Sequence, residues 1–321
     1  MNKTLSRALA LCVLAATPLL AAADTYPSKP ITMVVPFPPG GSTDVIGRLF
    51  AAKLGARLGQ TVVIENKPGA NTSIGAVAVA RAAPDGYTLM ITGAPTFTLN
   101  SLLYSNLNYD PVKSYEYVAI AGSTPFVILT NPQTGIGTMA DITKKSAAQS
   151  LSFGSFGNGS TPHIAGESLA QRTGAKLLHV PYRGSAPAMT DLIGNQIPLS
   201  IDTLVASLPQ IKAGKARAVA LTGSARSQLV PDVPTVAESG VAGYDFETWF
   251  GVVMPKGTPA PIVNRMSQEI QAVMAEPDTR AKLQELGFDA TYQDPAAFRA
   301  KVSAELERNV AVIKAAGIKP D

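Results

Sequence analysis

The sequence has a single cysteine, Cys12, and it lies within the first 23 residues. Those residues are typical of a secretory leader, because two basic residues precede an apolar run (8–20) and three alanines offer a cleavage site before Asp24. The run is too short and too alanine-rich to be a membrane span, and a lipoprotein cysteine would stand at the cleavage point. We therefore expect export to a bacterial periplasm and a mature chain without thiols or disulfides.

The net charge of the chain is also small. The chain has 27 basic and 23 acidic residues, a formal charge of +4, and two of the basic residues lie in the leader, which leaves +2. So small an excess argues against a polyanion-binding surface, and we expect no nucleic-acid partner. After the leader, no stretch is long and apolar enough to cross a membrane.

Several catalytic and cofactor motifs are missing. The P-loop, the G-x-G-x-x-G fingerprint and the G-x-S-x-G nucleophile elbow do not occur, and we expect no cofactor and no enzymatic activity. His163 and Glu167 have the i, i+4 spacing of two metal ligands, but a third ligand is lacking, so we expect no metal. A periplasmic hydrolase with a nucleophile near His163 or His179 is one alternative, against which the missing elbow counts.

The order of apolar runs predicts an α/β fold with parallel sheets. Strands are expected at 31–37, 61–67 and 88–92, with helices at 45–58 and 74–83 between them, and this alternation is typical of βαβ units. The pattern is repeated later in the chain, and the C-terminal part resembles neither unit. We therefore expect two lobes with a cleft between them. The remaining expected strands are 117–123 and 126–132, separated by a turn, then 151–153, 177–182, 197–202, 216–223 and 249–255, and the remaining expected helices are 162–172, 186–193, 261–274 and 295–315.

Two Gly/Ser-rich loops follow strands and open helices. In the first, two prolines and two glycines force a turn, and one of Ser42, Thr43 or Asp44 is expected to cap the helix. A helix N-terminus has free N–H groups that attract anions, so a pair of such loops indicates a site for a small anionic ligand. The alternative is a pair of capped turns that bind nothing. The candidate residues are Phe37, Pro39, Gly40, Gly41, Ser42, Thr43 and Asp44 in the first loop, and Ser155, Phe156, Asn158, Gly159, Ser160, Thr161 and His163 in the second.

Other candidates stand at strand ends. Arg183 can pair with a carboxylate, and Asp202 can accept a hydrogen bond from a ligand or cap the next helix. Thr92 and Gly93 end the third strand, and Phe97 and Trp249 are aromatic residues that either line the cleft or pack in the core.

Several stretches together resemble one family. VPFPPGGSTDVIGR, GNGSTPHIAGE, VPDVPTVAESG and WFGVVMPKGTPAPIVNRM are similar, in order and spacing, to the periplasmic solute-binding subunits of tripartite tricarboxylate transporters, the Bug proteins. The resemblance covers nearly the whole mature chain.

The resemblance implies a two-lobed "Venus flytrap" of the type II kind, in which two strands cross between the lobes. It implies that main-chain N–H groups of the loops 37–44 and 155–163 hold a ligand carboxylate. It places lobe 1 at 24–124 plus 246–321, and lobe 2 at 125–245. The implied partner is a two-subunit membrane permease, and we expect a monomer. A second alternative is a partner role for a sensor kinase, because sensing would use the same closed state.

This chain departs from the family at positions near the carboxylate cradle, that is, the two loops 37–44 and 155–163 whose N–H groups are expected to hold the ligand. Asn71 and Thr72 stand where relatives often have glycines, Phe97 stands where many have histidine, and Phe156 replaces a small residue. We expect these phenylalanines to favour an aromatic mono- or dicarboxylate such as terephthalate, with Arg183 as partner of a far carboxylate. If both rings pack in the core instead, the ligand is aliphatic.

Overall fold

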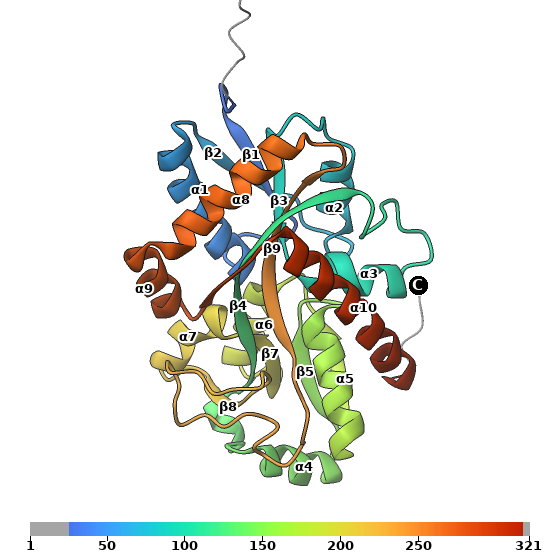
Figure 1. Cartoon of the computed structure of the whole chain (residues 1–321). Helices are drawn as coiled ribbons and strands as arrows, with labels where there is room; N and C mark the ends of the chain where they lie inside the picture. Colours follow the sequence, from blue (N-terminus) through green and yellow to red (C-terminus); the bar gives the residue numbers. More distant parts are fainter. Residues whose placement is uncertain (1–25, 317–321) are drawn as a thin grey trace, which may run out of the picture.

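The computed structural model describes residues 26–316, so the leader expected at 1–23 lies outside the described residues. Within the described range, none of the helices has the length and apolar character needed to cross a bilayer. Two α/β halves are joined along one continuous ten-stranded sheet (Figure 1). The strand order is β2-β1-β3-β9-β4-β7-β5-β6, with β10 and β8 also paired to β4.

The first half, blue to teal in Figure 1, is built on three parallel strands with β1 in the centre. The apolar run of β1 is continuous because both of its faces are buried: Met33 and Val35 face one core cluster and Val34 another. Its elements are β1 (Ile31–Val35), α1 (Ser42–Leu58), β2 (Val62–Asn66), α2 (Ser73–Ala80), β3 (Thr88–Thr92), the π-helical turn η1 (Pro95–Leu99) and α3 (Asn100–Leu103).

The second half, green to yellow, repeats this arrangement, with β5 parallel to both β6 and β7. Phe153 of β5 is buried in the core cluster of this half. Its elements are η2 (Pro132–Thr134), α4 (Met139–Ala148), β5 (Leu151–Ser155), α5 (Thr161–Thr173), β6 (Leu177–Pro181), α6 (Ser185–Ile193), β7 (Leu199–Thr203), α7 (Leu204–Lys212) and β8 (Arg217–Leu221).

Two long strands, β4 (Tyr115–Thr130) and β9 (Glu247–Pro255), connect the halves. The sequence predicts two strands and a turn where the structure has the single strand β4, and that prediction is wrong. Gly122, at φ +127, lies within a bulge against β9, so the chain changes direction there without leaving the sheet. Because β4 pairs with β9 and β10 as far as Pro125 and with β7 and β8 from Phe126 onward, one strand belongs to both halves.

The C-terminal elements return to the first half. Helix α10 also reaches the second half: its Ile313 packs with Leu99 and Leu103 of the first half and with Ile164 of α5. These elements are α8 (Ala260–Ala275), α9 (Pro277–Leu286), β10 (Asp289–Gln293) and α10 (Pro295–Ala316).

Candidate functional site

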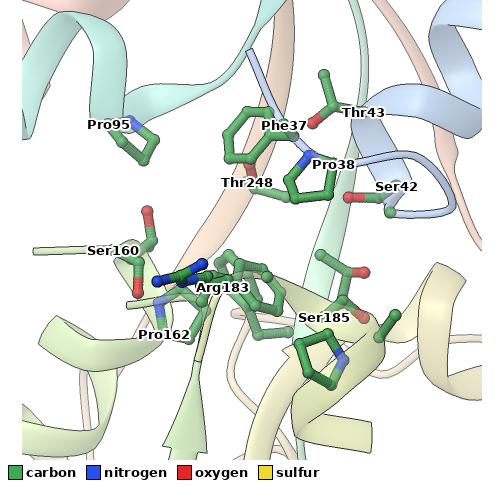
Figure 2. Close-up of a pocket in the computed structure, with 18 of the residues that line it drawn as sticks. Phe37, Pro38, Ser42, Thr43, Pro95, Ser160, Pro162, Arg183, Ser185 and Thr248 are labelled. Atoms are coloured by element: carbon green, nitrogen blue, oxygen red, sulfur yellow. The ribbon is translucent and has the colours of Figure 1, made fainter. Parts of the chain in front are cut away.

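A cavity of about 60 Å³ lies between the two halves, at the carboxyl ends of β1, β5, β6 and β7. In Figure 2, Phe37, Ser42, Thr43 and Pro95 face Ser160 and Ser185 across the gap. The predicted site residues that line it are Phe37, Pro39, Gly41, Ser42, Thr43, Phe156, Ser160, Thr161 and Arg183. The predicted residues outside the lining are Gly40, Asp44, Thr92, Gly93, Phe97, Ser155, Asn158, Gly159, His163, Asp202 and Trp249.

The first wall is the N-terminus of α1. The N-cap is Gly41, so the prediction that Ser42, Thr43 or Asp44 caps this helix is wrong. These three residues form the first helical turn instead, and the side chain of Asp44 accepts a hydrogen bond from the Gly40 N–H at 3.0 Å. Arg48 donates twice to the same carboxylate, at 2.9 Å each. Asp44 thus holds the turn, and the helix presents free N–H groups of its first turn to the cavity.

Burial alone would raise the pKa of Asp44, but hydrogen bonds from Arg48, the Gly40 backbone and Asn66 outweigh it and lower that pKa. The carboxylate therefore stays ionised and fully engaged in the turn. Asp44 does not line the cavity, but it stabilises the turn that does.

The second wall is the N-terminus of α5, which begins at Thr161 after the N-cap Ser160. The Ser160 hydroxyl donates to the Gly157 carbonyl at 2.7 Å, and the Gly159 N–H donates to His163 Nδ1 at 3.0 Å. Pro162 has no N–H, so the free backbone donors of this turn belong to Thr161 and His163. Thr161 Oγ1 is buried and has no hydrogen-bond partner among the described residues.

A third helix N-terminus completes the cavity, and sequence reasoning missed it. Helix α6 begins at Ser185 after Gly184, whose φ of +112 favours glycine. A Cβ at Gly184 would lie 3.2 Å from the Pro38 side chain, so the two halves approach closely here. This segment has the sequence pattern of the other two loops, in which a strand end is followed by a glycine, a serine and a helix. The sequence analysis nevertheless names only Arg183 here as a site residue.

Asp202 lies below α6 and is fully buried. Burial raises its pKa to about 7, although hydrogen bonds from Ser185 and Thr203 act in the opposite direction. Ser185 Oγ donates to Asp202 Oδ2 at 2.6 Å, and the Thr203 N–H donates to Oδ1 at 2.7 Å. Asp202 therefore orients two residues that line the cavity and does not reach it.

The two histidines form a stacked pair beneath the second loop, with ring centroids 3.8 Å apart. Ser155 Oγ and His179 Nε2 are 2.6 Å apart, a distance at which a base can activate a nucleophile. Ser155 is fully buried and lies outside the cavity lining, so this pair has no access to a substrate held there. Burial lowers the pKa of His163 to about 4 and that of His179 to about 3, and the neighbouring ring adds to the second shift.

Phe97 and Trp249 lie in the core of the first half. Phe97 is fully buried, and its ring is stacked on Trp249 with centroids 5.8 Å apart. The indole Nε1 donates to Glu305 at 2.8 Å. The π-helical turn η1 directs Phe97 inwards, so only Phe156 of the two expected phenylalanines contributes to the cavity.

Thr92, Gly93 and Asn158 also lie outside the lining. The Thr92 hydroxyl is buried and lies 2.7 Å from that of Thr96. A Cβ on Gly93 would lie 3.0 Å from Thr248 Oγ1, so glycine lets the wall residue Thr248 pack closely. Asn158 is exposed.

Arg183 lies at the border with a second cavity of about 530 Å³. The two cavities share Phe37, Pro38, Phe156, Arg183 and Gly184 as a common wall. The guanidinium is exposed and has no ion pair with any described residue, so it is available to an anion in either cavity. The described residues contain no group of three or more metal-ligating side chains.

The chain matches a family model described as the tripartite tricarboxylate transporter family receptor over residues 46–318. A UPF0065 protein of Agrobacterium vitis is 39% identical, and the match covers 92% of this chain and 87% of that protein. The solved structure of R. palustris Rpa4515 with adipate is 35% identical, with a TM-score of 0.90 over 92% of this chain and 100% of that one. MatC from Rhodopseudomonas palustris, with bound malate, is 30% identical, with a TM-score of 0.83 over 90% of this chain and 100% of that one.

Proposed function

The chain belongs to the tripartite tricarboxylate transporter receptor family, and on that premise we propose that it captures a small carboxylate in the periplasm for a membrane permease. The observation that carries the proposal is the convergence of three helix N-termini on one cavity. Each helix directs free N–H groups and the positive end of its dipole towards the same small volume. The Thr161 hydroxyl, which has no hydrogen-bond partner within residues 26–316, adds a side-chain donor there.

We propose that the two halves are lobes that close on the ligand, with lobe 1 at 24–124 plus 246–321 and lobe 2 at 125–245. Helix α1 belongs to lobe 1, and α5 and α6 belong to lobe 2, so a carboxylate in the cavity has donors from both. Closure then brings the second set of donors to a ligand already held by the first. Such hinge closure around a ligand is common in periplasmic binding proteins.

The shape of the site supports an elongated ligand. A volume of 60 Å³ holds a carboxylate and little more, since one water needs about 10–15 Å³. The second cavity shares a wall with the first, and half of its lining residues are three prolines together with Phe37, Phe156 and Tyr182. We propose that a flat aromatic acid such as terephthalate places its ring against these residues and its far carboxylate near Arg183.

Calorimetry on the chain from Asp24 onward tests the function and the ligand class together. The ligands are terephthalate, benzoate, adipate and malate, with terephthalamide as the uncharged control. Binding of the acids without binding of the amide supports the carboxylate cradle. If adipate and malate bind and both aromatic acids fail, the cradle stands and the aromatic proposal falls. If no carboxylate binds, the proposed function is wrong.

We further propose that the ligand-closed form, as a monomer, is what a two-subunit permease recognises. Light scattering checks the monomer. Stimulated uptake in vesicles that contain a two-subunit tripartite tricarboxylate permease checks the partner. A protein that leaves uptake unchanged but activates a sensor kinase would overturn it.

A further inference from the structure

The loop between β2 and α2 has an unusual backbone. Ala70, Asn71 and Thr72 follow Gly69, and all three have positive φ, at +44°, +45° and +80°. Left-handed conformations are costly for residues other than glycine, although asparagine tolerates them best. A run of three such residues persists only where the surroundings hold it in place, and strain of this kind is concentrated at functional sites.

The side chain of Asn71 explains what holds the loop. Its Nδ2 donates to the Gly159 carbonyl at 2.9 Å and to Asn100 Oδ1 at 2.8 Å. Asn100 Nδ2 in turn donates to the Asn71 carbonyl at 2.7 Å and contacts Tyr109 OH at 3.0 Å. Asn71 and Asn100 thus form a reciprocal amide pair in the first half, and one hydrogen bond leaves this pair towards the second half.

The acceptor of that bond lies in the second ligand loop. Gly159 immediately precedes Ser160 and Thr161, which line the cavity, and its N–H is fixed by His163. Its backbone also approaches the first half, because a Cβ there would lie 2.6 Å from Leu103 Cδ1. Asn71 additionally lines the second cavity, so it borders the ligand space on one side and holds the loop on the other.

We propose that Asn71 is a positioning residue that fixes the second loop (155–163) in the closed state. It does so by the hydrogen bond from its side-chain amide to the Gly159 carbonyl. The bond joins the two lobes, so opening must break it and closure must form it. A contact made only in the closed state increases the closed population and raises ligand affinity by the same factor. The ligand part of this inference rests on the proposed carboxylate function, whereas the closure part rests only on the proposed lobes.

The decisive variant is Asn71→Gly, because glycine adopts φ +45° without strain and removes only the amide side chain. The change relieves the left-handed backbone but also removes the Asn71 donor from the buried Asn100 Oδ1, so the two effects on the melting temperature oppose each other, and binding is compared well below that temperature. Affinity for the tightest carboxylate found by calorimetry should weaken about fivefold to tenfold, which is the effect of one neutral hydrogen bond. The loss should be in the dissociation rate, which stopped-flow competition measures.

Ala70→Gly is the matched control. It relaxes the backbone of the adjacent residue and leaves the Asn71 amide in place, so affinity should stay at the wild-type value. If Ala70→Gly weakens binding as much as Asn71→Gly, the loop conformation and not the amide is responsible, and the proposal is overturned.

A second measurement needs no ligand. Val63 on β2 and Leu178 on β6 are exposed, at 49% and 61%, on the outermost strands of the two halves. Cysteines at these positions are unique in the chain from Asp24 onward, and spin labels on them report the distance between the lobes. Asn71→Gly should shift this distribution to longer distances. Distances and affinity that both match the wild type would overturn the inference. A failure of every carboxylate to bind, with the distance shift present, would instead overturn only the proposed function.

Discussion

Replacing Thr161 by valine should change stability and ligand affinity in opposite directions. Thr161 is 7% exposed, and its Oγ1 has no hydrogen-bond partner among the described residues. A buried hydroxyl without a partner costs about 1–3 kcal/mol. Valine has nearly the same shape without the hydroxyl, so Thr161→Val should stabilise the ligand-free protein by about 1 kcal/mol, which raises Tm by about 1.5–2 °C for a chain of about 300 residues.

The ligand reverses this gain. A hydrogen bond from Thr161 to a carboxylate is charge-assisted and worth about 1.5–3 kcal/mol, so its loss weakens binding about tenfold to a hundredfold. At a ligand concentration about 100 times the wild-type Kd, the wild type gains about 2.7 kcal/mol, whereas a variant that binds ten times more weakly gains about 1.4 kcal/mol. The two melting curves should therefore exchange their order, or nearly coincide, when ligand is added.

Differential scanning calorimetry with and without ligand measures both effects, and Thr161→Ser is the control, because it keeps the hydroxyl and loses only a methyl group. The serine variant should bind within a few-fold of the wild type. Wild-type affinity in Thr161→Val would refute the role of the hydroxyl. A ligand-free Thr161→Val that melts below the wild type would refute the claim that the hydroxyl has no partner.

Three further variants test charges around the site. Arg183→Gln should weaken terephthalate binding at least about fivefold and leave benzoate within about twofold, as compared by calorimetry, because only the diacid has a far carboxylate. Asp202 has a folded pKa raised to about 7, above its unfolded value of about 4, so its contribution to stability increases as the pH falls through that window, by up to about 1.4 kcal/mol per unit. Urea unfolding should show this slope in the wild type and not in Asp202→Asn, and equal slopes would contradict the buried carboxyl. His179 has a folded pKa near 3, below its unfolded value of about 6.5, so stability should fall as the pH drops between these values. His179→Gln should show a shallower fall, and an unchanged profile would place the acid sensitivity elsewhere.

The sequence predicts the secondary structure well where one signal dominates. The strand at Ile31–Val35 and the helix that follows it are recognisable because a doubly buried strand is apolar throughout and the helix has apolar residues at Ile46, Phe50 and Leu54. Helix α9 was not expected, because its sequence, PDTRAKLQEL, has a weak apolar stripe and buries only Thr279 and Leu283.

The site was harder to predict than the fold, since it depends on side-chain direction. Phe97 follows a strand near the cavity, but the wider π-helical turn rotates its ring into the core, and no periodicity in the sequence indicates that turn. The segment around Ser185 contains both a strand-end arginine and a helix N-terminus, and the sequence pattern does not show that both border the cavity. The role of Asn71 is not visible in the sequence, where it is only a departure from glycine, because its contact with Gly159 joins segments that are far apart in the sequence.

The position of β9 has a consequence for how the protein reaches its native state. β9 pairs with β3 on one side and with β4 on the other, as in the register Thr92 to Gly251. The strand that joins β3 to β4 is therefore made after the whole second half. Contacts between residues so distant in sequence close large loops, and they slow folding. The second half has its own parallel strands, all of which precede β9 in the chain. The first half, in contrast, keeps an unpaired edge at β3 until β9 has been synthesised up to Pro255. The half that is synthesised first is therefore the half that is completed last.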